Sequence, residues 1–179
     1  WIDQAPALSF IVSDTVIELV ASHDGGNSWS APIQISPTVS SSIGLVDQVV
    51  QGSQPVVAPD GTVHVAWIDS TGDGPFEGLA ELYVAKSEDG GRNFTNPTRA
   101  SLFREPGFTA RNAYFRYWGS AFPQIAAGPN NEVYIAYTGL PSSKPEDDGD
   151  IYMVSSLDGG QTWIRRREQL NDDGGSGLQ

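Results

Sequence analysis

Ser22-His23-Asp24-Gly25-Gly26-Asn27-Ser28-Trp29 is the first of three stretches that share one pattern. The others are Ser87-Glu88-Asp89-Gly90-Gly91-Arg92-Asn93-Phe94 and Ser156-Leu157-Asp158-Gly159-Gly160-Gln161-Thr162-Trp163. Each copy reads Ser-x-Asp-Gly-Gly-x-(Ser/Asn/Thr)-aromatic, and the central aspartates are 65 and 69 residues apart (24 to 89, 89 to 158). A nearly constant long period is typical of a protein built from one repeated structural unit. We call the three copies the Asp-Gly-Gly turns.

The residue types of this pattern suit a tight reversal of the chain. A short carboxylate accepts hydrogen bonds from backbone N–H groups a few residues further on. Two glycines adopt positive φ angles without steric strain, and the aromatic residue begins the next strand and anchors the hairpin. The sequence therefore predicts structural roles for twelve residues of the three turns: Ser22, Asp24, Gly26, Trp29, Ser87, Asp89, Gly91, Phe94, Ser156, Asp158, Gly160 and Trp163.

The Asp-Gly-Gly turns resemble the Asp-box, or BNR repeat, of sialidases and related β-propellers. In that family the Asp-box joins the third and fourth strands of a four-stranded antiparallel blade, on the face away from the active site. The resemblance implies an all-β chain that forms part of a β-propeller, with structural rather than catalytic aspartates in the turns.

A second motif recurs at the same period and supports this fold. Residues 54–69 and 123–139 each read as strand, two-residue turn and strand, with Asp60-Gly61 and Asn130-Asn131 as the turn signals. Residues 1–3, Trp-Ile-Asp, repeat residues 67–69, so the sequence begins at the end of a second strand.

These signals divide residues 1–179 into parts of one propeller domain. Blade a (1–36) is incomplete, with strands at 1–3, 16–22 and 29–36. Blade b (54–101) has strands at 54–58, 63–69, 81–87 and 94–101, and blade c (123–169) has strands at 123–128, 132–138, 150–156 and 163–169. Residues 170–179 lead into a further blade. At about 67 residues per blade the chain holds about 2.7 blades, whereas a propeller closes with about four to eight. The sequence therefore predicts a fragment of a propeller of about six to eight blades.

Composition excludes several classes of protein. The net charge is −12, which disfavours binding to the phosphate backbone of nucleic acids. No apolar run approaches the length of about 18 residues that a membrane-spanning helix needs. Cysteine is absent, so disulfides and thiolate metal sites are excluded. The resemblance implies a secreted or cell-surface location, and a periplasmic one stays open.

Long connections are predicted on the face opposite the Asp-Gly-Gly turns, at 4–14, 37–53, 70–80, 102–122, 139–149 and 170–179. Such loops on a rigid scaffold usually carry the binding residues. The 102–122 connection combines arginines with aromatic residues, and these suit carboxylates and sugar rings respectively. We predict binding roles for Phe103, Arg104, Arg116, Tyr117 and Trp118. In the alternative, the aromatic residues cover a blade junction and the arginines pair with local acids.

Catalytic candidates rest on the resemblance. Sialidases carry a Phe/Tyr-Arg-Ile-Pro motif, which residues 103–106, Phe-Arg-Glu-Pro, match at three of four positions. The match departs from the family because glutamate replaces isoleucine and because it follows the second Asp-Gly-Gly turn. The family also uses further arginines, a Tyr–Glu pair and an aspartate. Residues of suitable type are Arg104, Arg111, Arg116, Tyr114, Tyr117, Glu105 and Asp69.

Acidic clusters indicate calcium as a possible ligand, and no other cofactor is expected. Asp69 and Asp73 flank one loop, residues 146–150 hold four acids, and Asp172 and Asp173 form a third group. Hard cations take several oxygen ligands, so Asp147, Asp148 and Asp150 are metal-ligand candidates. The alternative is a solvated acidic surface.

Two interpretations of function follow. In the first, the chain is a binding or structural module that contacts glycan or protein through its long-loop face, and other blades or neighbouring chains complete its arc. In the second, it is part of a sialidase-type exo-glycosidase that removes terminal sialic acid or a related sugar. Convergence of Arg104, Arg111 and Arg116 on a pocket would favour the second interpretation.

Overall fold

The computed structural model describes residues 12–42, 48–73, 78–105, 122–141, 149–164 and 168–171, and these residues form strands and turns. Within these ranges no helix is long and apolar enough to cross a membrane. The strands, in chain order, are β1 (Val12–Thr15), β2 (Glu18–Leu19), β3 (Ile33–Gln34), β4 (Val39–Ser42), β5 (Val50–Val57), β6 (Val63–Asp69), β7 (Leu79–Ser87), β8 (Thr98–Arg104), β9 (Gln124–Ala127), β10 (Val133–Gly139), β11 (Asp150–Ser156) and β12 (Glu168–Gln169).

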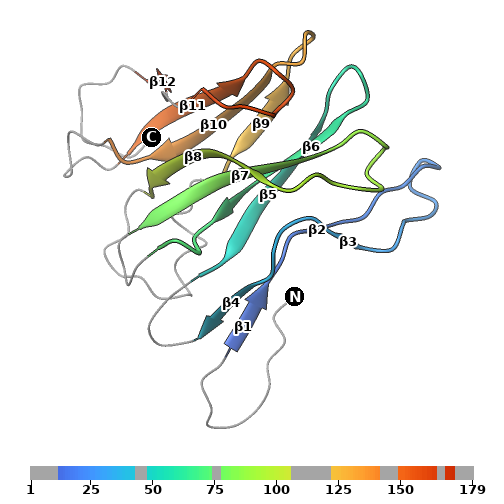
Figure 1. Cartoon of the computed structure of the whole chain (residues 1–179), viewed down its shortest axis with the longest axis horizontal. Helices are drawn as coiled ribbons and strands as arrows, with labels where there is room; N and C mark the ends of the chain where they lie inside the picture. Colours follow the sequence, from blue (N-terminus) through green and yellow to red (C-terminus); the bar gives the residue numbers. More distant parts are fainter. Residues whose placement is uncertain are drawn as a thin grey trace.

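The strands form sheets in which sequence neighbours pair antiparallel. One four-stranded sheet has the order β5-β6-β7-β8 and another the order β12-β11-β10-β9, while β1 pairs β4 and β2 pairs β3. The sheet of β5–β8 lies between the β1–β4 hairpin and the sheet of β9–β12 (Figure 1). Successive four-stranded meanders that pack face to face are the blades of a β-propeller, here an arc of two four-stranded sheets and part of a third.

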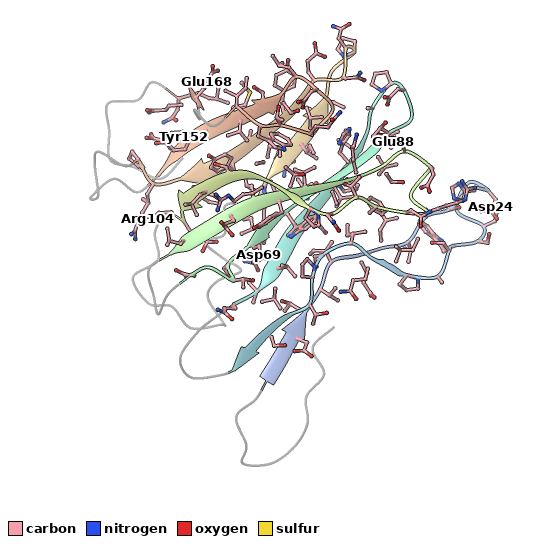
Figure 2. All side chains as sticks on the ribbon, viewed as in Figure 1. Asp24, Asp69, Glu88, Arg104, Tyr152 and Glu168 are labelled. Atoms are coloured by element: carbon pink, nitrogen blue, oxygen red, sulfur yellow. The ribbon has the colours of Figure 1, made fainter. Side chains whose placement is uncertain are left out.

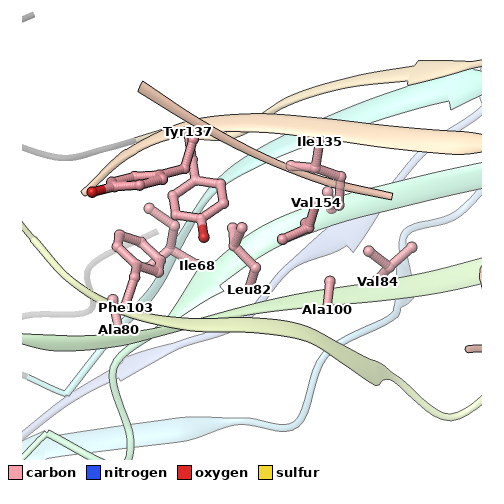
Figure 3. Close-up of a cluster of buried hydrophobic side chains, with 11 residues drawn as sticks. Ile68, Ala80, Leu82, Val84, Ala100, Phe103, Ile135, Tyr137 and Val154 are labelled. Atoms are coloured by element: carbon pink, nitrogen blue, oxygen red, sulfur yellow. The ribbon is translucent and has the colours of Figure 1, made fainter. Parts of the chain in front are cut away.

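Strand β6 is buried on both faces, which places it at the centre of the packing. Ala66 and Ile68 belong to a cluster with residues of β10 and β11, among them Ile135 and Val154 (Figure 3). Val65 and Trp67, on the other face, belong to a second cluster with residues of the first hairpin, such as Ile17. Alternate side chains of one strand therefore fill two different sheet junctions.

The predicted strands of the first blade are displaced. The hairpin arms run over β1–β2 and β3–β4, so two connections predicted as loops, 4–14 and 37–53, contain strands. Its two halves are linked where the N–H of Ile17 donates to Oγ of Ser36 at 2.8 Å, and Ser40 Oγ donates to Asp14 at 2.6 Å. Serine side chains that bond to the opposite arm stabilise a polar strand that shows no hydrophobic alternation.

Strand β8 is also displaced, from the predicted 94–101 to Thr98–Arg104. Thr95 already bonds across to Lys86 of β7, but the Lys86 N–H donates to the Thr95 side chain and not to its carbonyl, so the regular ladder starts later. Pro97 has no N–H to give to a ladder. Phe103 and Arg104 therefore lie on a strand and not in the predicted 102–122 loop.

The three Asp-Gly-Gly turns share one hydrogen-bond network. In each, the serine hydroxyl donates to the aspartate at 2.8 Å and accepts from the N–H of the second glycine at 2.7–2.9 Å. The aspartate also accepts from the backbone N–H four residues on, at 2.8–2.9 Å. These bonds to the charged form lower the pKa of Asp24 and of Asp158 to about 2, the largest contributions coming from Ser28 and Thr162.

The aromatic residue of the turn does not anchor all three hairpins. Phe94 and Trp163 are partly buried, and each packs on the junction with the preceding sheet. Trp29 is instead 63% exposed, so its predicted anchoring role is wrong in this structure.

We predict that Gly52→Ala destabilises the fold more than Gly61→Ala. Both glycines have positive φ angles, 69° and 89°, so alanine at either costs about 1–2 kcal/mol of backbone strain. A Cβ atom at Gly52 would also lie 2.3 Å from the Phe122 ring, whereas nothing lies within 4 Å at Gly61. This clash adds about 1–3 kcal/mol to the loss of stability in Gly52→Ala. Urea unfolding of both variants measures the difference. Equal losses of stability in the two variants would contradict the predicted clash with Phe122. So would a Gly52→Ala/Phe122→Ala double variant in which the extra loss at Gly52 remains.

The turn carboxylates also predict an acid-dependent stability. The folded pKa of Asp158, about 2, lies below its ordinary value of 3.8, so its contribution is present above pH 3.8 and is lost as pH falls through 2. We expect the unfolding midpoint of Asp158→Asn to be lower than that of the original protein at pH 7 and the gap to shrink towards pH 2. Glu168→Gln, on an exposed strand end, is the control. A gap that stays constant from pH 7 to 2 would contradict the prediction.

Candidate functional site: the long-loop edge

The sheets have two distinct edges. We define the long-loop edge by the ends of β6, β8 and β10 and the starts of β7 and β11, at residues 69, 104, 139, 79 and 150. Figure 2 shows Arg104 and Tyr152 towards this edge, and Asp24 and Glu88 at the edge that carries the Asp-Gly-Gly turns. The connections 106–121 and 142–148, outside the described residues, leave from and return to the long-loop edge.

Four buried carboxylates lie at this edge: Asp69, Asp73, Glu105 and Asp150. Two of them shape the connection after β6. Asp69 accepts a hydrogen bond from the N–H of Thr71 at 2.7 Å, and Asp73 accepts one from the N–H of Leu79 at 2.9 Å. The catalytic candidate Asp69 is therefore buried and holds a turn of its own segment.

Asp150 joins the start of β11 to the end of the described chain. Its carboxylate accepts from Nδ2 of Asn171 at 2.8 Å and from the hydroxyl of Tyr152 at 3.3 Å. Asn171 in turn accepts from the N–H of Ile151 at 2.9 Å. A single asparagine thus bonds to both the side chain and the backbone of β11, which fixes the strand end at this edge.

An aromatic cluster lies beneath the edge. Phe103 packs on Tyr137 with ring centroids 4.7 Å apart, and Tyr137 lies 6.1 Å from Tyr152 (Figure 3). Phe103 is only 3% exposed, so the structure places it in the core and not on a ligand-binding surface. The alternative stated for the aromatic residues, that they cover a blade junction, describes Phe103.

Arg104 is the one arginine of the predicted triad that the described residues include. Its side chain is exposed at the end of β8, and its carbonyl accepts from the N–H of Leu140 at 2.8 Å, which ties the two four-stranded sheets together. Arg111, Tyr114, Arg116, Tyr117 and Trp118 lie outside the described residues. The convergence of the three arginines stays a prediction.

The predicted metal site is not assembled by the part of the chain that the structure describes. Within the described ranges no three His, Asp or Glu side chains are grouped to hold an ion. Asp147 and Asp148 lie outside those ranges, and Asp150 bonds to Tyr152 and Asn171. Calcium binding stays a prediction.

The sequence missed two features near this edge. Glu81 and Arg99 form an ion pair across β7 and β8, and Tyr83 donates to Glu81 at 3.3 Å. Burial raises the pKa of Tyr83, and the Glu81 charge adds to this. The second feature is Phe122, an exposed ring seated over the bulge at Gly52. Both contacts arise from how the strands are placed next to one another, which the spacing of residues along the chain does not show.

The comparison with solved structures places the fold among known proteins. No protein-family model matches the sequence, and no curated protein matches it. A mutant of the α-L-arabinofuranosidase Arb93A from Fusarium graminearum, solved with an iminosugar inhibitor, is similar over 88% of this chain with a TM-score of 0.54 and 18% identity. A Hadza microbial sialidase is similar over 83% of this chain with a TM-score of 0.53 and 16% identity.

The likeness concerns the fold. The chain spans 41% of the length of the arabinofuranosidase structure and 30% of the sialidase structure. These are propeller-fold proteins, so the all-β, partial-propeller architecture predicted from the sequence is confirmed. The narrower assignment to the sialidase-like group is not shown by this likeness.

We predict that Asn171→Ala destabilises the long-loop edge by about 1–3 kcal/mol, because it leaves a buried carboxylate and a strand N–H without these bonds. Urea unfolding measures the loss, and amide hydrogen exchange should show reduced protection at Ile151. Asn130→Ala is the matched control, since Asn130 bonds to Glu132 on an exposed turn. Similar losses for the two variants would show that the link from Asn171 to β11 is unimportant.

Proposed function

We propose that this chain is part of a sialidase-like, Asp-box β-propeller that binds glycan through its long-loop edge. The observation that supports it best is the arrangement around residues 106–121. The chain leaves the edge after Glu105, beside the exposed Arg104, and returns at the exposed ring of Phe122. An arginine fork suits a sugar carboxylate, and an aromatic ring suits the face of a sugar.

The intervening sequence adds to the same chemistry. Arg111, Arg116, Tyr117 and Trp118 belong to the segment that begins and ends at this edge. The neighbours in fold are named as an arabinofuranosidase and a sialidase, so glycans are a natural ligand class to test first. The alternative is a protein ligand at the same edge, and an unbiased binding screen would distinguish it from a glycan.

Binding suits the described residues better than hydrolysis. Asp69, Asp73 and Asp150 bond to the segments that they hold, and a retaining glycosidase needs two carboxyl groups about 5 Å apart beside the scissile bond. Other blades or neighbouring chains would complete the arc, and an extracellular, cell-surface or periplasmic location suits a glycan ligand.

We predict that Arg104→Ala weakens binding to acidic glycans about tenfold or more, since a charged hydrogen bond contributes about 1.5–3 kcal/mol. A glycan array should identify the ligands of the full protein, and calorimetry should measure the affinity of each variant. Arg92→Ala is the matched control, because Arg92 is also exposed but lies in an Asp-Gly-Gly turn at the opposite edge.

The same preparations also test the enzyme alternative. Turnover of an aryl α-sialoside or an aryl α-L-arabinofuranoside, lost on Arg104→Ala, would replace binding by hydrolysis as the function. If no glycan binds, or if Arg92→Ala and Arg104→Ala weaken binding equally, the long-loop edge is not the site.

A further inference from the structure

A groove lies at the other edge of the molecule, between the sheet of β5–β8 and the third Asp-Gly-Gly turn. It consists of two adjoining cavities of about 230 and 160 Å³, which share His64, Lys86 and Gln161 in their walls. Glu88 marks this edge in Figure 2. Together the cavities reach the lower part of the range for small-molecule sites, about 300–1,000 Å³.

The floor of the groove is a buried imidazole. His64 is 1% exposed, and its Nδ1 atom has no hydrogen-bond partner among the residues that the structure describes. The ring lies against Gly160, where a Cβ atom would be 3.5 Å from Nδ1. The turn at Gly160 covers this nitrogen, so the ring is a wall of the groove and reports on a ligand that enters it.

The preceding junction shows that this groove is not a general feature of the turns. The residue three positions before the serine of the turn is Leu19 in the first hairpin and Val84 in the β5–β8 sheet. Leu19 reaches the next turn, where its Cδ2 atom lies 3.4 Å from a Cβ position on Gly91. The shorter Val84 instead lines the larger cavity beside His64.

The charged groups around the groove are already engaged. Lys86 pairs with Glu88 at 2.8 Å, Asp60 accepts from the N–H of Thr62 at 2.9 Å, and Glu132 accepts from the N–H of Asn130 at 2.8 Å. The Asp158 carboxylate bonds within its own turn. Burial, followed by the nearby Lys86 charge, lowers the pKa of His64 below its ordinary value, which favours the neutral imidazole.

The remaining groups suit an uncharged polar ligand. Thr98 and Asn96 line the larger cavity, and neither side chain forms a hydrogen bond with the described residues. The chain carries a net charge of −12, which repels anions. Hydroxyl, amide and imidazole groups that donate and accept match the hydroxyl groups of a neutral sugar.

From this geometry we propose that the groove between His64 and Gly160 binds a single neutral sugar residue. The site is separate from the long-loop edge and does not depend on the function proposed there. Sugar hydroxyls would bond to Thr98 and Asn96 beside the His64 ring, and Val84 would contact the apolar side of the sugar.

Imidazole NMR of the 179-residue chain tests the proposal directly. The sequence has two histidines, and His23 lies exposed in the first Asp-Gly-Gly turn, so its signal is an internal control. His64→Gln assigns the two signals. We expect D-galactose, D-mannose or N-acetyl-D-glucosamine to shift the His64 signal saturably in the millimolar range and to leave the His23 signal unchanged.

Two variants test the groove itself. Val84→Leu restores the longer side chain of the first junction and should weaken sugar binding at least tenfold. Thr98→Val keeps the shape but removes the hydroxyl, and should weaken it about three- to tenfold. Thr138→Val on β10 is the control for the threonine change. Arg104→Ala should leave the His64 response unchanged, which separates this site from the long-loop edge.

Three outcomes would overturn the proposal. The first is that no neutral sugar shifts the His64 signal while the variants remain folded. The second is that N-acetylneuraminate shifts it and the neutral sugars do not, which would refute the charge argument. The third is an equal response of the His64 and His23 signals, which would indicate non-specific binding.

Discussion

The structure depends on the need to cover both faces of each apolar sheet. Strand β6 carries this constraint, since Ala66 and Ile68 pack on one neighbouring sheet and Val65 and Trp67 on the other. This sheet alone would expose both apolar faces to water, so its packing between two others stabilises it. Face-to-face stacking follows from the sequence of the strand itself. The same constraint explains why Phe94 and Trp163 are partly buried at sheet junctions, whereas Trp29, which belongs to neither cluster, is exposed.

The two edges of the stack use acidic residues in different ways. At one edge the aspartates of the Asp-Gly-Gly turns accept bonds from their own turns, and the lowered pKa values of Asp24 and Asp158 follow from these bonds. At the other edge, Asp69 and Asp73 shape a loop, and Asp150 holds the end of β11 through Asn171. A carboxylate that caps its own turn leaves the edge rigid. A carboxylate that fixes the end of a loop holds in place the point from which the loop extends. Loops held in this way on a rigid scaffold often carry binding residues, which favours ligand binding at the long-loop edge.

Local pattern predicted the strands wherever packing imposes alternation. Residues 63–69 and 150–156 were predicted as strands, and β6 and β11 have these bounds because their alternate side chains enter different environments. The pattern failed at 37–53, where Ser40 of β4 bonds across the hairpin and the strand carries no hydrophobic alternation. It also failed for Phe103, since an aromatic residue near an arginine reads as recognition until the register of β8 places it beside Tyr137. The spacing of residues along a strand cannot show which face of the next sheet it meets.

The groove at His64 forms at a junction between two sheets. In the repeat, His64 corresponds to Tyr134 and Val84 to Leu19. The sequence alone does not show what these differences do, because their effect depends on the contact between two sheets. At the first junction Leu19 fills the space beside the next turn, so the junction is closed by apolar contact. At the second, a shorter valine and a polar ring leave a cavity with a buried nitrogen that no described residue satisfies. The cavity therefore follows from a difference of side chains between two junctions, and the proposed sugar would occupy the space that Leu19 fills at the first.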